Sequence, residues 1–557
     1  MGKSKTSELV FVALGGIGEI GMNAYLYGHG PADARQWLMV DLGITFPTDA
    51  EPGVDIILPD IRFIEEERTN LLALVLTHAH EDHFGAVIEL WPKLKVPIYA
   101  TPFTAALLKA KLAEQQPGLK LPIKEIPLGG RFQIGPFDLE LITVAHSIPE
   151  PNGIAIRTDV GRVFHSGDWK LDPTPLIGRP TDEKRIKAFA AEGIDALICD
   201  STNALREGFS PSETDVTAKL IEIIGAAKKR VIVTTFASNV GRIRAVADAT
   251  KAAGRHLVVI GRAMHRVMRV GMETGYLPKG MKYLDQREFG YLERDEVVAL
   301  VTGSQGEARA ALSRIAEESH PDVSLAKGDM VIFSSRNIPG NETGIGRVQN
   351  SLADMGCQII TDSDALVHVT GHPRRGELRL MYEWCHPRAA IPMHGEARHL
   401  EEHARLARAA GVKEIVHARN GSVVRIAPGV AEIIDDVPVG RKHRDGRLIV
   451  SSDDGPSRNR RKLSAVGIVV VSLVMTRQGE IEAEPQVMLD GVPQADADGV
   501  PMAEIVLDAV NGALQSIPKS RRKDMPTVQE AARRAARSAV DQVWGKKPIC
   551  KVLLTVI

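Results

Sequence analysis

The sequence predicts an α/β fold that ends in a small α+β domain, and three observations lead to this prediction. A short apolar strand at residues 72–77 runs directly into a cluster of histidines. Apolar strands then alternate with helical segments over residues 208–368, which is typical of a mainly parallel sheet. Finally, a polar and basic segment at residues 446–463 is followed by an apolar strand, a helix and a last strand.

Length and composition limit the classes of protein to consider. The 557 residues suffice for about three to four domains. Because the formal net charge is only −1, a nucleic-acid-binding surface would have to be a local basic patch. The four cysteines are far apart in the sequence, which argues against a disulfide framework and favours a reducing compartment. No apolar stretch of about twenty residues and no signal-peptide core occur, so we expect a cytoplasmic protein that does not contact a membrane.

The histidine cluster has the residue types and spacing of metal ligands. His78, His80, Asp82 and His83 lie within six positions at the carboxyl end of a strand, where α/β sheets usually place their sites. Imidazole and carboxylate groups suit Zn²⁺ or Mn²⁺. The first two histidines can face one metal from an extended segment, and the other two residues, after a turn, can face a second. Surface histidines on a polar loop are the plain alternative, which this spacing disfavours.

Further ligand types stand at the ends of later predicted strands. His146 and Asp168 each follow a strand, and His394 lies between a strand and a long amphipathic helix. Asp41 ends an earlier strand, and we expect it to orient a metal-binding histidine rather than to bind the metal itself. A simple turn residue is the alternative for Asp41.

Four strands of the alternating region end in small, polar, glycine-bearing loops. Backbone N–H groups at such strand-to-helix turns favour anions, although each loop taken alone predicts only a turn. Because four such loops occur in one alternating unit, we expect a cleft lined for phosphate. The loops cover residues 235–242, 302–307, 334–342 and 368–372.

The motif Thr77-His-Ala-His-Glu-Asp-His83-Phe-Gly85 resembles the signature of the metallo-β-lactamase superfamily. The α/β insert between Asp200 and His372 resembles that of its β-CASP nucleases, and the motifs Cys199-Asp-Ser-Thr-Asn203 and Met393-His-Gly-Glu396 are most similar to the bacterial ribonuclease J family. The resemblance implies an αββα metallo-β-lactamase sandwich, a β-CASP α/β domain and a small α+β domain.

The expected domain boundaries follow from the same resemblance. The metallo-β-lactamase domain is expected in two parts, with the β-CASP domain between them. A linker and a C-terminal domain that serves oligomerisation complete the chain. In chain order the ranges are 1–207, 208–368, 369–445, 446–463 and 464–557.

The resemblance also implies roles for single residues. Two Zn²⁺ ions are implied, with Mn²⁺ or Mg²⁺ as alternatives in activity. Asp82, Asp168, Asp200 and His372 are the implied catalytic residues, with His372 donating a proton to the leaving oxygen and Asp200 orienting a neighbouring histidine. One metal is implied to be held by His78, His80 and His146, and the other by Asp82, His83 and His394, with Asp168 bridging the two. Residues expected to bind the 5′-phosphate and RNA are Ala237, Ser238, Asn239, His368, Val369, Thr370, Gly371 and His372.

The expected function is that of a metal-dependent ribonuclease. The resemblance implies 5′-to-3′ exonuclease activity that prefers 5′-monophosphate ends, together with endonuclease activity, in RNA maturation and mRNA decay. Single-stranded RNA, further copies of the chain in a dimer or tetramer, and other RNA-decay enzymes are the expected partners. A β-CASP nuclease acting on DNA and a non-catalytic scaffold of RNA decay are the alternatives. A hydrolase of small esters is disfavoured by the insert.

Overall fold

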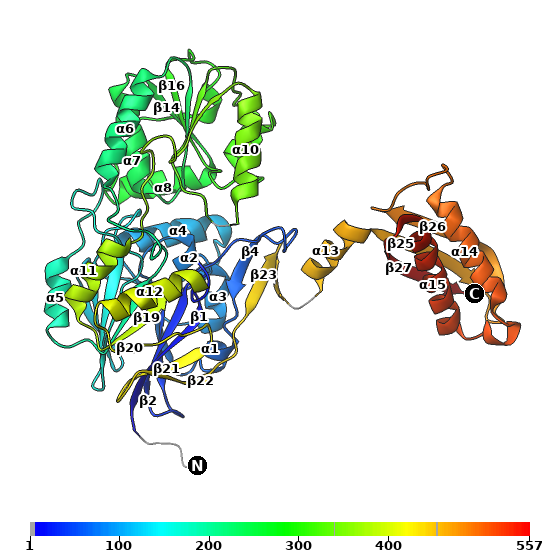
Figure 1. The fold of residues 1–557 in the computed structure, drawn as a ribbon, viewed down its shortest axis with the longest axis horizontal. Coiled ribbons are helices and arrows are strands. Elements are labelled where there is room, and N and C mark those ends of the chain that lie inside the picture. The colour runs from blue at the N-terminus through cyan, green and yellow to red at the C-terminus, as the bar shows by residue number, and fades with distance from the viewer. Residues whose placement is uncertain (1–5, 339, 453–454) are drawn as a thin grey trace. The chain divides into compact units, whose positions relative to one another are not determined.

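The computed structural model describes residues 6–338, 340–452 and 455–557 (Figure 1). Two compact units form: a larger unit from Met1–Phe46 with Ile57–Lys442, and a smaller unit from Pro47–Ile56 with His443–Ile557. Within the described residues, no helix has both the length and the apolar character needed to cross a membrane.

The first layer of the larger unit is an eight-stranded sheet with the order β22-β21-β1-β2-β3-β5-β6-β7. Strand β1 pairs antiparallel with both β2 and β21, so the start of the chain joins a segment more than 400 residues later. Strands β3, β5, β6 and β7 run parallel. The strands are β1 (Glu8–Gly15), β2 (Ala24–Gly30), β3 (Gln36–Val40), β5 (Leu71–Val75), β6 (Ile98–Ala100), β7 (Ile123–Glu125), β21 (Ser422–Ala427) and β22 (Glu432–Asp436).

The second layer is a seven-stranded sheet with the order β20-β19-β12-β11-β10-β9-β8. Alternate residues of both sheets enter one shared core, among them Phe11 and Leu38 from the first sheet and Ile154 and Ile198 from the second. This is the packing of two sheets face to face. The strands are β8 (Arg131–Ile134), β9 (Phe137–Thr143), β10 (Asn152–Arg157), β11 (Arg162–His165), β12 (Ala196–Asp200), β19 (Ala389–Met393) and β20 (Glu414–Ile415).

Helices cover the outer faces of both sheets. Phe189 of α5, Leu378 of α11 and Leu406 of α12 form a second core with the side chains that point outward from the second sheet. On the first sheet, Trp37 points away from the shared core and packs edge-on against Phe63 of α1, with 5.3 Å between ring centroids. These layers form the αββα sandwich that was predicted. The helices are α1 (Arg62–Glu66), α2 (Glu81–Phe84), α3 (Val87–Leu94), α4 (Pro102–Gln115), α5 (Glu183–Ala190), α11 (Arg375–Cys385) and α12 (Ala397–Ala409).

A parallel α/β domain is inserted between β12 and β19, as predicted. Its sheet has the order β15-β14-β16-β13-β17-β18, and β16 and β17 lie on either side of β13. The loops after these three strands therefore meet at one edge, where parallel sheets bind ligands. The elements are α6 (Glu213–Ala226), β13 (Val231–Thr234), α7 (Val240–Ala252), β14 (His256–Ile260), α8 (Arg262–Glu273), β15 (Leu284–Asp285), η1 (Gln286–Glu288), β16 (Val297–Val301), α9 (Ala311–Ala316), β17 (Met330–Phe333), α10 (Glu342–Asp354) and β18 (Gln358–Ile360).

The smaller unit contains a three-stranded sheet with the order β26-β25-β27 and two long helices. Alternate residues of β25 are buried, and they form a core with one face of α14 and of α15. The strand predicted from residue 464 begins at Ile468, because α13 continues to Val466 and Gly467 ends it with a φ of 63°. The remaining elements are β4 (Ile56–Pro59), β23 (Arg441–Asp445), β24 (Leu448–Ser451), α13 (Pro456–Val466), β25 (Ile468–Met475), β26 (Ile481–Asp490), α14 (Met502–Ser516), η2 (Lys519–Arg521), α15 (Met525–Trp544) and β27 (Ile549–Val556).

Candidate metal centre

Seven side chains with metal-binding atoms gather where strands of the two facing sheets end. They form two groups, and within each group one potential ligand atom per residue lies within 4.8 Å of all the others. The carboxylate of Asp168 belongs to both groups. The first group consists of His78, His80, His146 and Asp168, and the second of Asp82, His83, Asp168 and His394.

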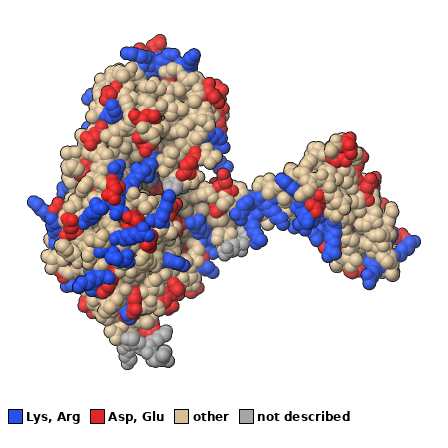
Figure 2. All heavy atoms as spheres, in the orientation of Figure 1, with Lys and Arg blue, Asp and Glu red and all other residues tan. Residues whose placement is uncertain are grey.

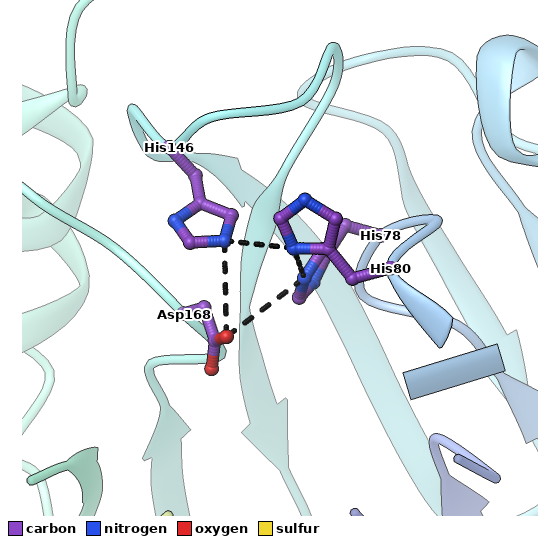
Figure 3. A group of neighbouring side chains, drawn as sticks. All are labelled: His78, His80, His146 and Asp168. Atoms are coloured by element: carbon purple, nitrogen blue, oxygen red, sulfur yellow. Dashed lines mark hydrogen bonds and ion pairs between the residues drawn. The ribbon is translucent and has the colours of Figure 1, made fainter. Parts of the chain in front are cut away.

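In the first group, three imidazole rings and one carboxylate point toward one another (Figure 3). Nδ1 of His80 lies 3.1 Å from Nε2 of His78 and 3.0 Å from Nε2 of His146. Oδ2 of Asp168 lies 3.9 Å and 3.8 Å from the same two Nε2 atoms. Burial, together with the neighbouring imidazoles, lowers the pKa of His78 and His80 well below its usual value, and burial lowers that of His146 to about 3. The rings are therefore neutral, as metal ligation requires.

The second group is organised around Asp168. Its Oδ2 lies 3.1 Å from Nε2 of His83 and 3.4 Å from Nε2 of His394, and Oδ2 of Asp82 is 3.7 Å from each of these nitrogens. Burial alone would raise the pKa of Asp168, but the charges of His394 and His83 hold it well below the usual range. Asp168 in turn raises the pKa of both rings, so each must lose a proton when a cation binds. Oδ1 of Asp168 and Nε2 of His394 are buried without a hydrogen-bond partner. Orphaned buried atoms in a His/Asp donor set fit divalent cations.

Hydrogen bonds to the far side of the rings fix their orientation. Nδ1 of His83 lies 2.7 Å from Asp41, whose carboxylate also accepts from both the backbone N–H and the hydroxyl of Thr77. Nδ1 of His146 lies 2.5 Å from the carbonyl oxygen of Gly371, and a Cβ at this glycine would lie 2.5 Å from the imidazole ring. These contacts suit the role expected for Asp41, that of orienting a metal-binding imidazole, which stays a prediction.

Asn23 contacts three residues of the two groups, a role that was not predicted from the sequence. Its Oδ1 lies 2.9 Å from Nδ1 of His394, and its Nδ2 donates to the carbonyl oxygen of Asp82 and lies 3.0 Å from Nε2 of His83. The segment before Asn23 is rich in glycine and predicts only a turn, which gives no reason to single out the amide. The only available signal was that a polar residue follows this glycine-rich loop at the start of an apolar strand.

Asp200 and His372 form a pair at the edge of the two groups. Nδ1 of His372 lies 2.7 Å from Oδ2 of Asp200 and 3.8 Å from Oδ2 of Asp168. Burial would lower the pKa of His372, but the two carboxylates raise it to about 9. His372 is thus an imidazolium at neutral pH, and it lies close enough to the centre to deliver a proton there.

The predicted phosphate-binding residues lie in two neighbouring loops. Asn239 caps α7 by accepting from the backbone N–H of Arg242, and Ala237 and Ser238 precede it. The stretch from His368 to His372 starts beside the same edge, because Ser334 at the end of β17 donates to the carbonyl oxygen of Val367. Within that stretch, Val369 and Thr370 are buried and Gly371 is half-buried.

Arg242 ends one of the predicted loops, at residues 235–242, but the role of its side chain was not predicted. It is fully buried, and its guanidinium donates to the carbonyl oxygen of Val367 over 2.7 Å and to Glu213 over 2.9 Å. Burial and Arg242 together hold the pKa of His368 well below its usual value. The arginine thereby ties α7 to the start of the 368–372 stretch.

A sandwich of two sheets with a His/Asp centre at the strand ends defines a metal-dependent hydrolase of the metallo-β-lactamase class. The family models that match the chain are the metallo-beta-lactamase superfamily (residues 18–229), the Ribonuclease J beta-CASP domain (228–352), the Zn-dependent metallo-hydrolase RNA specificity domain (362–418) and the Ribonuclease J C-terminal domain (458–557).

Curated relatives give the particular family. The chain is 50% identical over 552 residues to Ribonuclease J of Sinorhizobium meliloti, covering 99% of this chain and 98% of the relative. It is 38% identical over 562 residues to Ribonuclease J of Corynebacterium glutamicum, covering 100% and 76%, and 31% identical over 553 residues to Ribonuclease J2 of Bacillus subtilis, covering 99% of each. The chain belongs to the ribonuclease J family.

The family membership confirms the predicted activity class. The protein is a metal-dependent hydrolytic ribonuclease that binds RNA. The alternatives of a DNA nuclease and of a non-catalytic scaffold are therefore set aside. A solved structure described as a protein of unknown function from Enterococcus faecalis V583 shares the fold, with a TM-score of 0.50, 15% identity, and coverage of 75% of this chain and 100% of that chain.

Proposed function

We propose that this ribonuclease degrades single-stranded RNA in the 5′-to-3′ direction from 5′-monophosphate ends and also cleaves RNA internally. Its cellular role would be RNA maturation and mRNA decay in the cytoplasm, alongside other RNA-decay enzymes. The proposal rests on one observation: a single segment of the chain connects the predicted phosphate loops with the candidate metal centre. The stretch 368–372 begins beside the predicted phosphate loops and ends in His372, next to the metal centre.

The seven ligand residues are suited to two Zn²⁺ ions, with Mn²⁺ or Mg²⁺ as alternatives in activity. Two divalent cations at this site would activate the attacking water and neutralise charge on the scissile phosphodiester. The chain holds the donor atoms in place through Asp41, Asn23 and the carbonyl of Gly371. Asp168 serves both halves of the centre because its carboxylate faces histidines from each.

His372 is the proposed general acid. Its proton is retained at neutral pH because Asp200 and Asp168 raise its pKa to about 9. It therefore can protonate the 3′ oxygen that leaves when the phosphodiester breaks, which yields a product with a 5′-phosphate. Asp200 keeps the ring oriented through the 2.7 Å hydrogen bond to Nδ1.

The terminal phosphate is assigned to the loop that opens α7. The amino end of a helix favours an anion, and Ser238 and Asn239 stand at this end, with the 13-residue helix behind them. A monophosphate would gain charge-assisted hydrogen bonds worth about 1.5–3 kcal/mol each. A triphosphate would overfill such a site, and a 5′-hydroxyl would leave the donors unpaired.

A comparison of 5′ ends tests this proposal. Exonucleolytic rates are measured on one RNA sequence that carries a 5′-monophosphate, triphosphate or hydroxyl. Combined Ser238→Ala and Asn239→Ala changes should erase the preference for the monophosphate while internal cleavage persists. Combined Ser351→Ala and Asn350→Ala changes in α10 of the same domain are the matched control and should keep the preference. Equal wild-type rates on monophosphate and triphosphate ends would refute the assignment.

We further propose that the smaller unit assembles the protein into a homodimer or homotetramer. Helices α14 and α15 cover one face of its sheet. The opposite face carries Val470, Met488 and Leu553, of which Met488 is 59% and Leu553 is 60% exposed. The same face also carries Lys551 and Gln486, so exposed apolar side chains stand among polar ones, a mixture that suits contact with a second copy of the chain.

A further inference from the structure

Three arginines from distant parts of the sequence lie around one asparagine. Arg206 follows β12 and donates its backbone N–H to the carbonyl oxygen of Asn203 over 2.9 Å. Arg336 follows β17 and donates through Nη1 to Oδ1 of Asn203, also over 2.9 Å. Arg374 precedes α11, and the next residue, Arg375, donates its backbone N–H to the carbonyl oxygen of Arg206. The fold thus brings three separate segments to one place.

This cluster is connected to the proposed general acid. Nδ2 of Asn203 donates to Oγ1 of Thr370 over 2.8 Å and to the carbonyl oxygen of His372 over 3.2 Å. The amide of Asn203 therefore joins the Arg336 side chain to the segment that carries His372. A ligand held by the arginines would lie close to the reaction centre.

The side chains of the cluster have no direct counter-ion in the part of the chain that the structure describes, although the buried carboxylate of Glu377 accepts the backbone N–H of Arg374 over 2.7 Å. Within the described residues, no carboxylate forms an ion pair with Arg206, Arg336 or Arg374, and Nε of Arg374 is buried without a partner. Asp362 attracts the first two only at longer range. Burial and the neighbouring arginines lower the pKa of Arg336 to about 10 and also lower that of Arg206. The nearby Glu207 is engaged by Arg375 at 2.5 Å.

We propose that Arg206, Arg336 and Arg374 form a subsite for a phosphodiester of the RNA backbone beyond the scissile bond. Guanidinium groups match phosphate oxygens with paired, charge-assisted hydrogen bonds. Arg206 is exposed and the other two arginines are half-buried, so the site is open to a chain that passes through. The proposed site for the terminal phosphate is less open than this arginine site, because Asn239, one of its donors, is buried. Figure 2 shows further basic side chains, mixed with acidic ones, over the neighbouring α11 and α12.

The subsite rests on the proposed reaction at the metal centre, and substrate length tests it. A 5′-monophosphorylated dinucleotide has only the terminal and the scissile phosphate, whereas an RNA of about twenty nucleotides also reaches the subsite. With combined Arg206→Gln and Arg374→Gln changes, KM for the longer RNA should rise about tenfold for each arginine. The value of kcat/KM for the dinucleotide should stay within about twofold. The salt dependence of affinity should flatten by about 0.7 in log–log slope for each lost contact.

Arg408→Gln is the matched control. Arg408 lies on α12 and is exposed, and like the three arginines it has no ion-pair partner within the described residues. This variant should bind both substrates as the wild type does. If the double variant has a lowered Tm, the single Arg206→Gln change at an exposed side chain carries the test.

A circular RNA separates this inference from the proposed end preference. It has no 5′ end, so weaker binding of circular RNA by the double variant would support the subsite even if the preference for 5′-monophosphate ends proved wrong. Wild-type affinity of the double variant for circular and long linear RNA would overturn the subsite and leave the end preference untouched. An equal loss on the dinucleotide would also overturn it, because the arginines would then hold the terminal or scissile phosphate.

Discussion

Replacing Asp168 by alanine removes the one side chain that belongs to both ligand groups. Each group then falls from four potential ligands to three. Oδ2 of Asp168 lies 3.1–3.9 Å from ring nitrogens of five histidines, which are His83, His394, His146, His372 and His78. No other carboxylate of the centre is shared in this way, so the loss should weaken metal binding by both ligand groups.

The size of the effect follows from this geometry. Metal-based stabilisation of charge in the transition state is worth several kcal/mol, and a loss of about 4 kcal/mol corresponds to about a thousandfold in kcat. The fold should survive. Asp168 is the chief cause that raises the pKa of His394 and of His83, so both rings can remain neutral once it is gone.

The assay combines turnover of a 5′-monophosphorylated RNA, metal content by elemental analysis and the Tm. We expect Asp168→Ala to retain its fold, to bind less metal per chain and to lose nearly all turnover. Asp329→Ala, a change of another buried carboxylate that is paired with Arg294 in the inserted domain, controls for the loss of a buried charge. It should lower stability without lowering metal content. Wild-type rate and metal content in Asp168→Ala would refute the shared-ligand account.

Three further predictions concern the acid, the ligand support and the assembly. Because the pKa of His372 is raised to about 9, its proton is present below that pH and lost above it, so kcat should fall as pH rises through about 9. Asp200→Asn should move this alkaline limb of the pH profile to lower pH. If the limb does not move, the Asp200–His372 pair is not its source. Asn23→Ala should weaken metal affinity about 10–100-fold in a chelator titration, as is usual when the support of a ligand is lost, and unchanged affinity would remove Asn23 from the centre. Met488→Glu with Leu553→Glu should lower the mass seen by light scattering, and an unchanged mass would place the interface elsewhere.

The metal centre was predictable because its signals are local. His78, His80, Asp82 and His83 stand within one short segment, and the other ligands each follow an apolar strand. Parallel strands bring their carboxyl ends to one edge, so residues that end separate strands meet in space. The strand ends marked these residues as candidates, and the resemblance to the metallo-β-lactamase superfamily assigned them to two metals.

The supporting residues were not predictable, since their roles depend on long-range contacts. Asn23 lies 371 residues from His394 in the sequence, and nothing near it indicates a metal ligand. Arg242 lies in a helix, where an arginine ordinarily faces solvent, and only the fold reveals Glu213 and the carbonyl of Val367 as its partners.

The segment at residues 446–463 shows a different reason for a missed element. Its arginines, glycine and serines favoured a linker, yet β24 and most of α13 form there. Pro456 at the first turn and Gly467 at the end are ordinary helix boundaries. The polar and basic composition of the segment favoured a linker more strongly than these boundary signals favoured a helix, so no helix was predicted there.

RNA should be consumed from its 5′-monophosphate end by a metal-dependent reaction. The most direct measurement follows an RNA whose 5′-monophosphate is radiolabelled, with enzyme stripped of metal by a chelator and then restored with Zn²⁺ or Mn²⁺. We expect no cleavage by the stripped enzyme. After metal is restored, labelled mononucleotide should be the first product, before any labelled fragment of intermediate length. Two results would contradict this expectation: a ladder of labelled fragments that shorten from the 3′ end, or cleavage by the stripped enzyme at the same rate as by the restored enzyme.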